Sequence, residues 1–233
     1  MLIATVVALL ATPAVALAAG GSTATVRVEG LKHNLLLPKV VHTRSGWITR
    51  YGASKGSCSA KSAQGALDVA TRHRWKGKWS TQFGPEYEVT SILGETHRFT
   101  SKYYWEIFVN NVMAPTGACE IKLHRGEHLL FAAVPDVGTE YPLGLRLLDK
   151  PVAGRPFRVR VVYYDAKGKA RPLAGATVTG GAISAEPIPN SRISATTNSQ
   201  GVATLTEDRL GLLDISASKP GYIRAAPAFR NVT

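Results

Sequence analysis

The segment "YYWEIFVNN", residues 103–111, alternates its side chains with the period of two that is typical of a β-strand. One face of this strand is apolar throughout and should pack on the core; it carries Tyr103, Trp105, Ile107 and Val109. The opposite face carries Tyr104, Glu106, Phe108 and Asn110. Tyr104 and Phe108 would be exposed unless a second domain, a crossing loop or a ligand covers them, so they are candidate ligand contacts.

The segments around this strand predict the order ββαβββ, a mixed sheet with one helix on one face. The helix is expected within residues 57–75, where Ala63, Ala66, Leu67 and Ala70 recur at helical spacing and Ser57 or Ser59 can cap the start. The strands are expected in "TATVRVEG" (23–30), "LLLPKVVHT" (35–43), "YEVTSILG" (87–94), residues 103–111 and "EIKLHRGEHLLFAAV" (120–134), the last interrupted by a turn at "HRGE".

The second half of the chain shows no helical period. About seven short strand-like runs, separated by Gly, Pro, Asn and Asp, predict an antiparallel β-sandwich. Prolines and a glycine in "PDVGTEYP" (135–142) mark a boundary between the two halves. We therefore expect a mainly β protein with one helix, in which a ββαβββ domain over residues 20–138 precedes a sandwich domain over residues 139–233.

The first 21 residues, "MLIATVVALLATPAVALAAGG", form an apolar run that ends in small residues. Ala16, Leu17 and Ala18 give an A-x-A cleavage pattern, so residues 1–19 are expected to be a signal peptide. The alternative is an uncleaved membrane anchor. A membrane span needs about 20 apolar residues, and this run is interrupted by Thr5, Thr12 and Pro13.

Two cysteines, Cys58 and Cys119, are present in the whole sequence. In an oxidising compartment an isolated pair most simply forms one disulfide, and two buried free thiols are the alternative. Neither belongs to a CxxC pair, so a redox or zinc role has no support.

The formal net charge is +12, and the excess is spread along the chain. There are 15 basic and 10 acidic residues before about residue 140, and 13 and 6 after it. A nucleic-acid groove should concentrate its charge, so nucleic acid is not an expected partner. For a secreted chain the available polyanions are cell-wall polymers, acidic glycans or lipid headgroups, the last implying peripheral membrane association; solubility alone is the other explanation.

The stretch "RHRWKGKW", residues 72–79, alternates cations with two tryptophans. In one interpretation the cations end the helix, Lys76-Gly77-Lys78 forms the exit turn, Trp75 closes the core and Trp79 begins the next strand. In the other, the stretch contacts a polyanion or glycan through Arg72, Arg74, Lys76 and Lys78.

Two motifs resemble known families. "YYWEIFVNN" with "CEIKLHRGEHLLFAAV" (119–134) resembles the YW-x-x-x-VNG and L-x-x-GD strand pair of the transcobalamin-like C-terminal β-grasp family, over about residues 22–135. Asn111 stands where that family usually has Gly, and Glu127 where it usually has Asp. The resemblance implies an extracellular β-grasp module, which in vitamin-B12 carriers closes over the corrinoid beside a larger α-helical domain. That larger domain has no counterpart in this sequence.

The second half resembles the immunoglobulin-like or carboxypeptidase-regulatory-like domains of bacterial surface proteins. The resemblance rests on "PLAGATVTGG", "TNSQGVATLT" and "LLDISASKPGYIRA". It implies a spacer or an adhesive module. Pro227 should cut short the closing strand.

Catalytic and metal motifs are missing from the sequence. No G-x-S-x-G, P-loop or G-x-G-x-x-G occurs. His124 and His128 are four apart, but the expected β-turn with Gly126 at its corner does not fit a zinc helix. We therefore expect no metal, no cofactor and no enzyme. The expected function is secreted binding or adhesion at the bacterial cell surface; a small-molecule carrier that needs a second ligand-gripping domain and an uncharacterised hydrolase are the alternatives.

Overall fold

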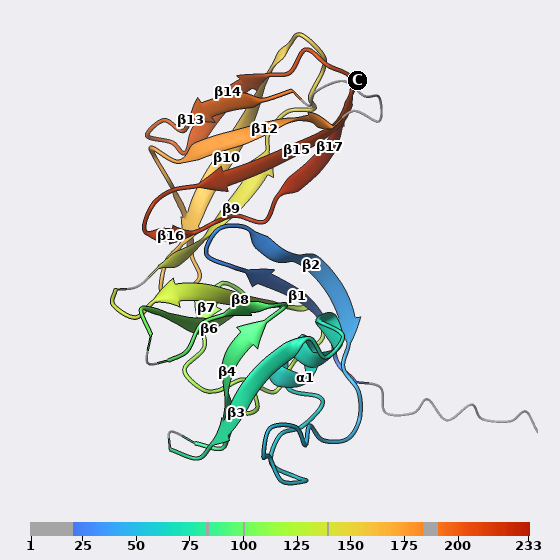
Figure 1. Ribbon diagram of the computed structural model, residues 1–233. Coiled ribbons are helices and arrows are strands. Elements are labelled where there is room, and N and C mark those ends of the chain that lie inside the picture. The colour runs from blue at the N-terminus through green and yellow to red at the C-terminus, as the bar shows by residue number, and fades with distance from the viewer. Residues whose placement is uncertain (1–20, 83, 100, 139, 184–190) are drawn as a thin grey trace, which may run out of the picture.

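The computed structural model describes residues 21–82, 84–99, 101–138, 140–183 and 191–233. The expected signal peptide lies outside these residues. The protein is mainly β with a single described helix, and Figure 1 shows its two halves stacked one on the other. Within the described part of the chain, no helix is long and apolar enough to cross a membrane.

The first half has the predicted ββαβββ order, with three short additions. Its main sheet has the strand order β2-β1-β8-β6-β7, in which β1 and β8 run parallel and the other pairs run antiparallel. A smaller antiparallel sheet, β3-β4-β5, lies beside it. The elements are β1 (Thr23–Glu29), β2 (Asn34–His42), α1 (Ala63–Ala70), β3 (Trp75–Ser80), β4 (Glu86–Ile92), β5 (Glu95–Thr96), β6 (Tyr103–Val109), β7 (Val112–Met113) and β8 (Glu127–Pro135).

The second half is a sandwich of two sheets around one apolar core, antiparallel except for the short parallel pair of β9 and β16. One sheet has the order β11-β10-β9-β16, with β14 also paired to β10, and the other has the order β13-β12-β15-β17. The strand after Pro227 was not expected, and it pairs with β15 over five residues. The strands are β9 (Tyr141–Leu147), β10 (Pro156–Tyr164), β11 (Ala170–Pro172), β12 (Thr177–Ile183), β13 (Ile193–Thr196), β14 (Val202–Thr206), β15 (Gly211–Ser218), β16 (Tyr222–Ile223) and β17 (Ala228–Val232).

Helix α1 is shorter at both ends than the sequence predicts. Its N-cap is Ser62, whose side chain accepts a hydrogen bond from the Gly65 N–H at 3.4 Å; the prediction of Ser57 or Ser59 is wrong. Residues 58–60 cannot be helical because their backbone pairs with residues 46–48: Ile48 N donates to Cys58 O, and Ala60 N donates to Gly46 O. The helix has no basic residue in its last turn.

The second domain packs on the face of β6 that carries Tyr104 and Phe108, where it covers Phe108 and leaves Tyr104 half-buried. Phe108 is only 2% exposed and packs in a small cluster with Ile223 of β16. The expectation that Phe108 contacts a ligand is therefore wrong, because a neighbouring domain already covers it. Strand β8 fills the same layer from Leu130 to Val134 and is buried on both faces.

Polar contacts also join the two domains. Arg224 pairs with the buried carboxylate of Glu29 and donates to the carbonyls of Gly30 at 2.6 Å and Leu31 at 2.8 Å. Arg27 donates to Glu29 at 3.2 Å and to the Arg224 carbonyl at 3.0 Å. Burial raises the pKa of Glu29, and the positive charges of Arg27 and Arg224 oppose that shift. Arg27 and Glu29 lie on the face of β1 opposite its apolar residues.

Candidate functional site

A groove of about 640 Å³ opens between β4 and β6. It exists because these strands face each other without pairing: β4 belongs to the smaller sheet and β6 to the main one. β7 pairs only with Phe108 and Val109, so no strand within the described part of the chain covers the rest of that edge of β6. One carboxylate oxygen of Glu106 accepts from the neighbouring Ile107 N–H at 2.8 Å.

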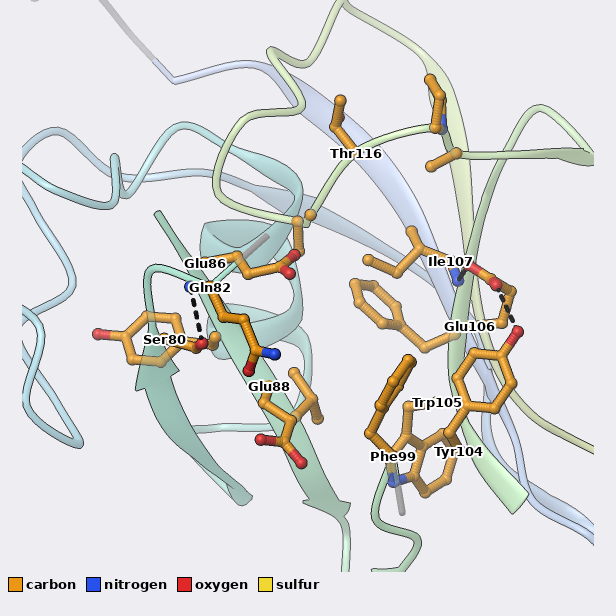
Figure 2. Close-up of a pocket in the computed structure, with 17 residues that line it drawn as sticks. Ser80, Gln82, Glu86, Glu88, Phe99, Tyr104, Trp105, Glu106, Ile107 and Thr116 are labelled. Carbon is orange, nitrogen blue, oxygen red and sulfur yellow. Dashed lines mark hydrogen bonds between the residues drawn. The ribbon is translucent and has the colours of Figure 1, made fainter. Parts of the chain in front are cut away.

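Figure 2 shows the two walls of this groove. Gln82, Glu86 and Glu88 come from the side of β4, and Phe99, Tyr104, Trp105, Glu106 and Ile107 come from the opposite side. The loop of residues 114–118 closes one end. That loop is anchored to the start of α1, because Gln64 N donates to the Ala118 carbonyl at 3.1 Å.

The disulfide strengthens the same anchor. Cys58 and Cys119 are bonded, with their Cα atoms 5.0 Å apart, which confirms the predicted pairing. The bond ties the segment before α1 to the loop between β7 and β8, directly after the residues that line the groove. The groove wall is therefore held covalently as well as by hydrogen bonds.

The charged groups that line the groove are all acidic among the described residues: Glu86, Glu88 and Glu106. Burial raises the pKa of Glu86, and the nearby carboxylates of Glu120 and Glu88 raise it further. Burial also raises the pKa of Glu106, against its hydrogen bonds from Ile107 N and Tyr104 Oη.

Aromatic rings form much of the β6 wall. The ring centroids of Phe99 and Tyr104 lie 5.7 Å apart in an edge-to-face arrangement. Tyr104 Oη donates to Glu106 at 3.0 Å, and burial with this neighbouring carboxylate raises the pKa of Tyr104 to about 12. Trp105 is only 8% exposed, and its indole N–H has no hydrogen-bond partner among the residues that the structure describes. A buried donor without an acceptor is costly, so it is a candidate for hydrogen bonding to a ligand.

The structure places the basic tryptophan stretch elsewhere. Arg72 follows the helix in a left-handed turn (φ 52°), so it does not lie in the last helical turn, and neither does Arg74. Lys76 and Lys78 project from β3 instead of forming an exit turn, because β3 begins at Trp75 and pairs with β4. Arg72, Arg74, Lys76 and Lys78 are all exposed.

Trp75 is the core residue of that stretch. It is 1% exposed, as the core interpretation predicts, and its ring contacts Tyr51 and Tyr87 edge-to-face at 5.2 and 5.0 Å. Its indole nitrogen donates to Asp68 at 2.7 Å, and the other oxygen of Asp68 lies 2.7 Å from His73 Nδ1. The role of Asp68 as a hydrogen-bond partner of Trp75 was not predicted from the sequence. The available signal was that Asp68 is the single carboxylate in the helix and stands seven residues before Trp75.

His124 and His128 lie on either side of the expected β-turn. The turn with Gly126 at its corner is present: Gly126 has φ 85°, and Glu127 N donates to His124 O. His128 lies in β8. No group of three or more His, Cys, Asp and Glu side chains suited to a metal ion occurs among the residues that the structure describes.

Comparison with known proteins adds a partial family match. A domain of unknown function, DUF4430, matches residues 67–133. The match runs from α1 into β8 and includes both walls of the groove, the first motif of the β-grasp resemblance and all but the last residue of the second. No curated protein matches the chain.

Two solved structures are similar at low identity. A "putative metal binding protein" from Ruminococcus gnavus has 13% identity and a TM-score of 0.34, covering 49% of this chain and 97% of its own. The D00-D0 domain of Intimin has 14% identity and a TM-score of 0.25, covering 90% of this chain and 95% of its own. At these TM-scores neither structure bears on the function of this chain.

Proposed function

We propose that this protein is a secreted, non-catalytic binding module of the bacterial cell surface that holds a small ligand in the groove between β4 and β6. The observation that carries the proposal is the groove itself, in which aromatic rings and carboxylates surround a buried indole N–H without an acceptor. Mostly apolar clefts with a few polar groups are typical ligand sites. The disulfide supports an extracytoplasmic location.

The second domain would act as a spacer or an adhesive module. It contributes no described residue to the groove, but it buries the reverse face of the sheet that carries one wall. Its contacts through Arg224 would fix the direction in which the groove faces. The alternative of a corrinoid-like carrier needs a second gripping domain from another chain, since the sandwich domain lies behind the groove wall and does not face the groove.

A ligand screen on the full chain tests the proposal. Small metabolites and glycans are added to ¹⁵N-labelled protein, and the indole N–H signals are followed by NMR. We expect a ligand to shift the Trp105 signal and to leave that of Trp47, which is 48% exposed outside the groove, unchanged. The variant Phe99→Ala should bind that ligand more weakly than the wild type does. Hydrolysis of a screened compound would contradict the proposal that the module is non-catalytic. A shift of the Trp47 signal alone would contradict the proposal that the ligand binds in the groove.

A second candidate function is attachment to anionic cell-wall polymers. It is favoured by the exposure of Arg72, Arg74, Lys76 and Lys78, two of which lie on the solvent-facing side of β3. These cations would act with the general positive charge of the chain.

Polymer attachment should depend steeply on salt. The screening length falls from about 30 Å at ~0.01 M salt to about 8 Å at ~0.15 M, so co-sedimentation with isolated anionic wall polymer should weaken across that range. The double variant Lys76→Gln with Lys78→Gln should weaken it more than the matched variant Lys167→Gln with Lys169→Gln in the second domain. Equal losses of polymer binding in the two double variants would show that attachment depends only on the overall charge. Binding that does not change with salt would rule out an electrostatic mechanism.

A further inference from the structure

The groove is acidic in a strongly basic protein. Its described lining contains Glu86, Glu88 and Glu106 and no Lys, Arg or His, whereas the whole chain carries a net charge of +12. An acidic cavity in such a chain is not explained by composition. The groove would attract cations and repel the anions that the rest of the surface attracts.

The negative charge in the groove lacks a protein counter-ion. Glu86, Glu88 and the adjacent Glu120 make no ion pair with any described residue. Lys78 lies opposite Glu88 in the β3–β4 register, yet the two side chains do not meet as an ion pair. Glu106 differs, because it already accepts from Tyr104 and Ile107. Glu86 and Glu88 are therefore the carboxylates available to a ligand.

Glu86 is held close to the loop that ends the groove. A Cβ atom added to Gly117 would lie 1.9 Å from Glu86 Oε2, so the carboxylate rests directly against the Gly117 backbone. In Figure 2 the side chains of Glu86 and Glu88 extend from β4 toward the side where Phe99 and Trp105 lie. Carboxylates on one wall and aromatic rings on the other are the two groups that bind organic ammonium ions.

A metal ion fits this arrangement less well. Calcium needs six to eight oxygen ligands in a tight cluster, and the described residues contain no such cluster. The unpartnered indole N–H of Trp105 adds a second requirement, since it is a donor only and needs an oxygen acceptor.

We propose that the groove binds a small organic ammonium ion that also carries a hydroxyl or carbonyl oxygen. Its cationic end lies beside Glu86 and Glu88 and against the aromatic wall, and its oxygen accepts from Trp105. This inference rests on the proposed function and names the ligand class of the same site.

Choline and its neutral isostere 3,3-dimethyl-1-butanol, which replaces the nitrogen by carbon, form the test pair. Titrations of the full chain are followed through the Trp105 indole signal. We expect choline to bind at least about fivefold more tightly than the isostere, as a cation–π and carboxylate site requires. Equal affinities for the two, or no shift with choline, would overturn the proposal.

Charge variants give an independent check. Glu86→Gln should weaken the binding of choline by about fivefold. It should not lower the melting temperature, because the fold disfavours the ionised form of this residue. Lys78→Gln should leave the affinity unchanged or increase it, and Asp208→Asn in the second domain is the neutral control. Weaker binding by Lys78→Gln and tighter binding by Glu86→Gln would identify an anion site instead.

The outcomes separate this inference from the proposed function. If neutral compounds in the screen shift Trp105 while choline does not, the groove is a ligand site and only the ammonium class is wrong. If choline and every screened compound leave Trp105 unchanged, both proposals fall.

Discussion

Trp75→Ala is expected to lower the free energy of unfolding by about 3–5 kcal/mol, the cost of truncating a fully buried large aromatic side chain. The indole is 1% exposed, contacts the rings of Tyr51 and Tyr87, and donates to Asp68. Its loss would leave a cavity between α1 and the β3–β4 hairpin and remove a hydrogen bond from a carboxylate that is mostly buried. Urea unfolding followed by circular dichroism measures the change.

Trp47→Ala is the matched control for this prediction. Trp47 is 48% exposed, so its truncation should cost far less than that of Trp75. Lys76→Gln and Lys78→Gln should each change stability by no more than about 0.5 kcal/mol, as surface substitutions usually do. The structural account of Trp75 would be wrong if Trp75→Ala left the melting temperature unchanged while it abolished attachment to wall polymers.

Removal of the disulfide has the second large expected effect. Cys58 and Cys119 are 61 residues apart in sequence, and opening a loop of that size should cost about 4 kcal/mol in the chain-entropy model. The double variant Cys58→Ala with Cys119→Ala should therefore melt well below the oxidised protein. Since the bond anchors the loop at the end of the groove, ligand affinity should fall as well.

Reduction of the unmodified protein is the control. The wild type in reductant should melt near the double variant, and mass spectrometry should show both cysteines protected from alkylation until reductant is added. Alkylation of both thiols without reductant would contradict the bond. A reduced protein as stable as the oxidised one would show that packing alone holds the loop.

Local patterns in the sequence were sufficient for most elements of the first domain. Strand-like runs predicted β1, β2, β4 and β6, with a period of two in β1 and β6. The spacing of Ala63, Ala66, Leu67 and Ala70 predicted α1, because these side chains pack on the core of their own domain. The cysteine pairing followed from the isolation of two thiols.

Predictions failed where a neighbouring segment supplied the backbone partners. The part of the 120–134 strand that was expected before its turn is reduced to one bridge between Ser62 and Lys122, because residues 118 and 121 accept hydrogen bonds from the start of α1; the part after the turn forms β8. Strand β3 was missed because its Gly and Lys residues resemble a turn, although Trp75 and Trp79 alternate with them as strand residues do.

The sequence by itself determined most of the longer strands, the helix, the disulfide and which face of β6 is apolar. Only the tertiary structure decided what covers the other faces. Arg27 and Glu29 occupy the polar side of β1, yet both are buried, and Arg224, nearly 200 residues away, contacts both. The groove is also a result of the tertiary structure, because β4 and β6 belong to different sheets and do not pair. Periodicity reports how a strand divides its own side chains between two faces, whereas the partner of each face depends on contacts between residues distant in sequence.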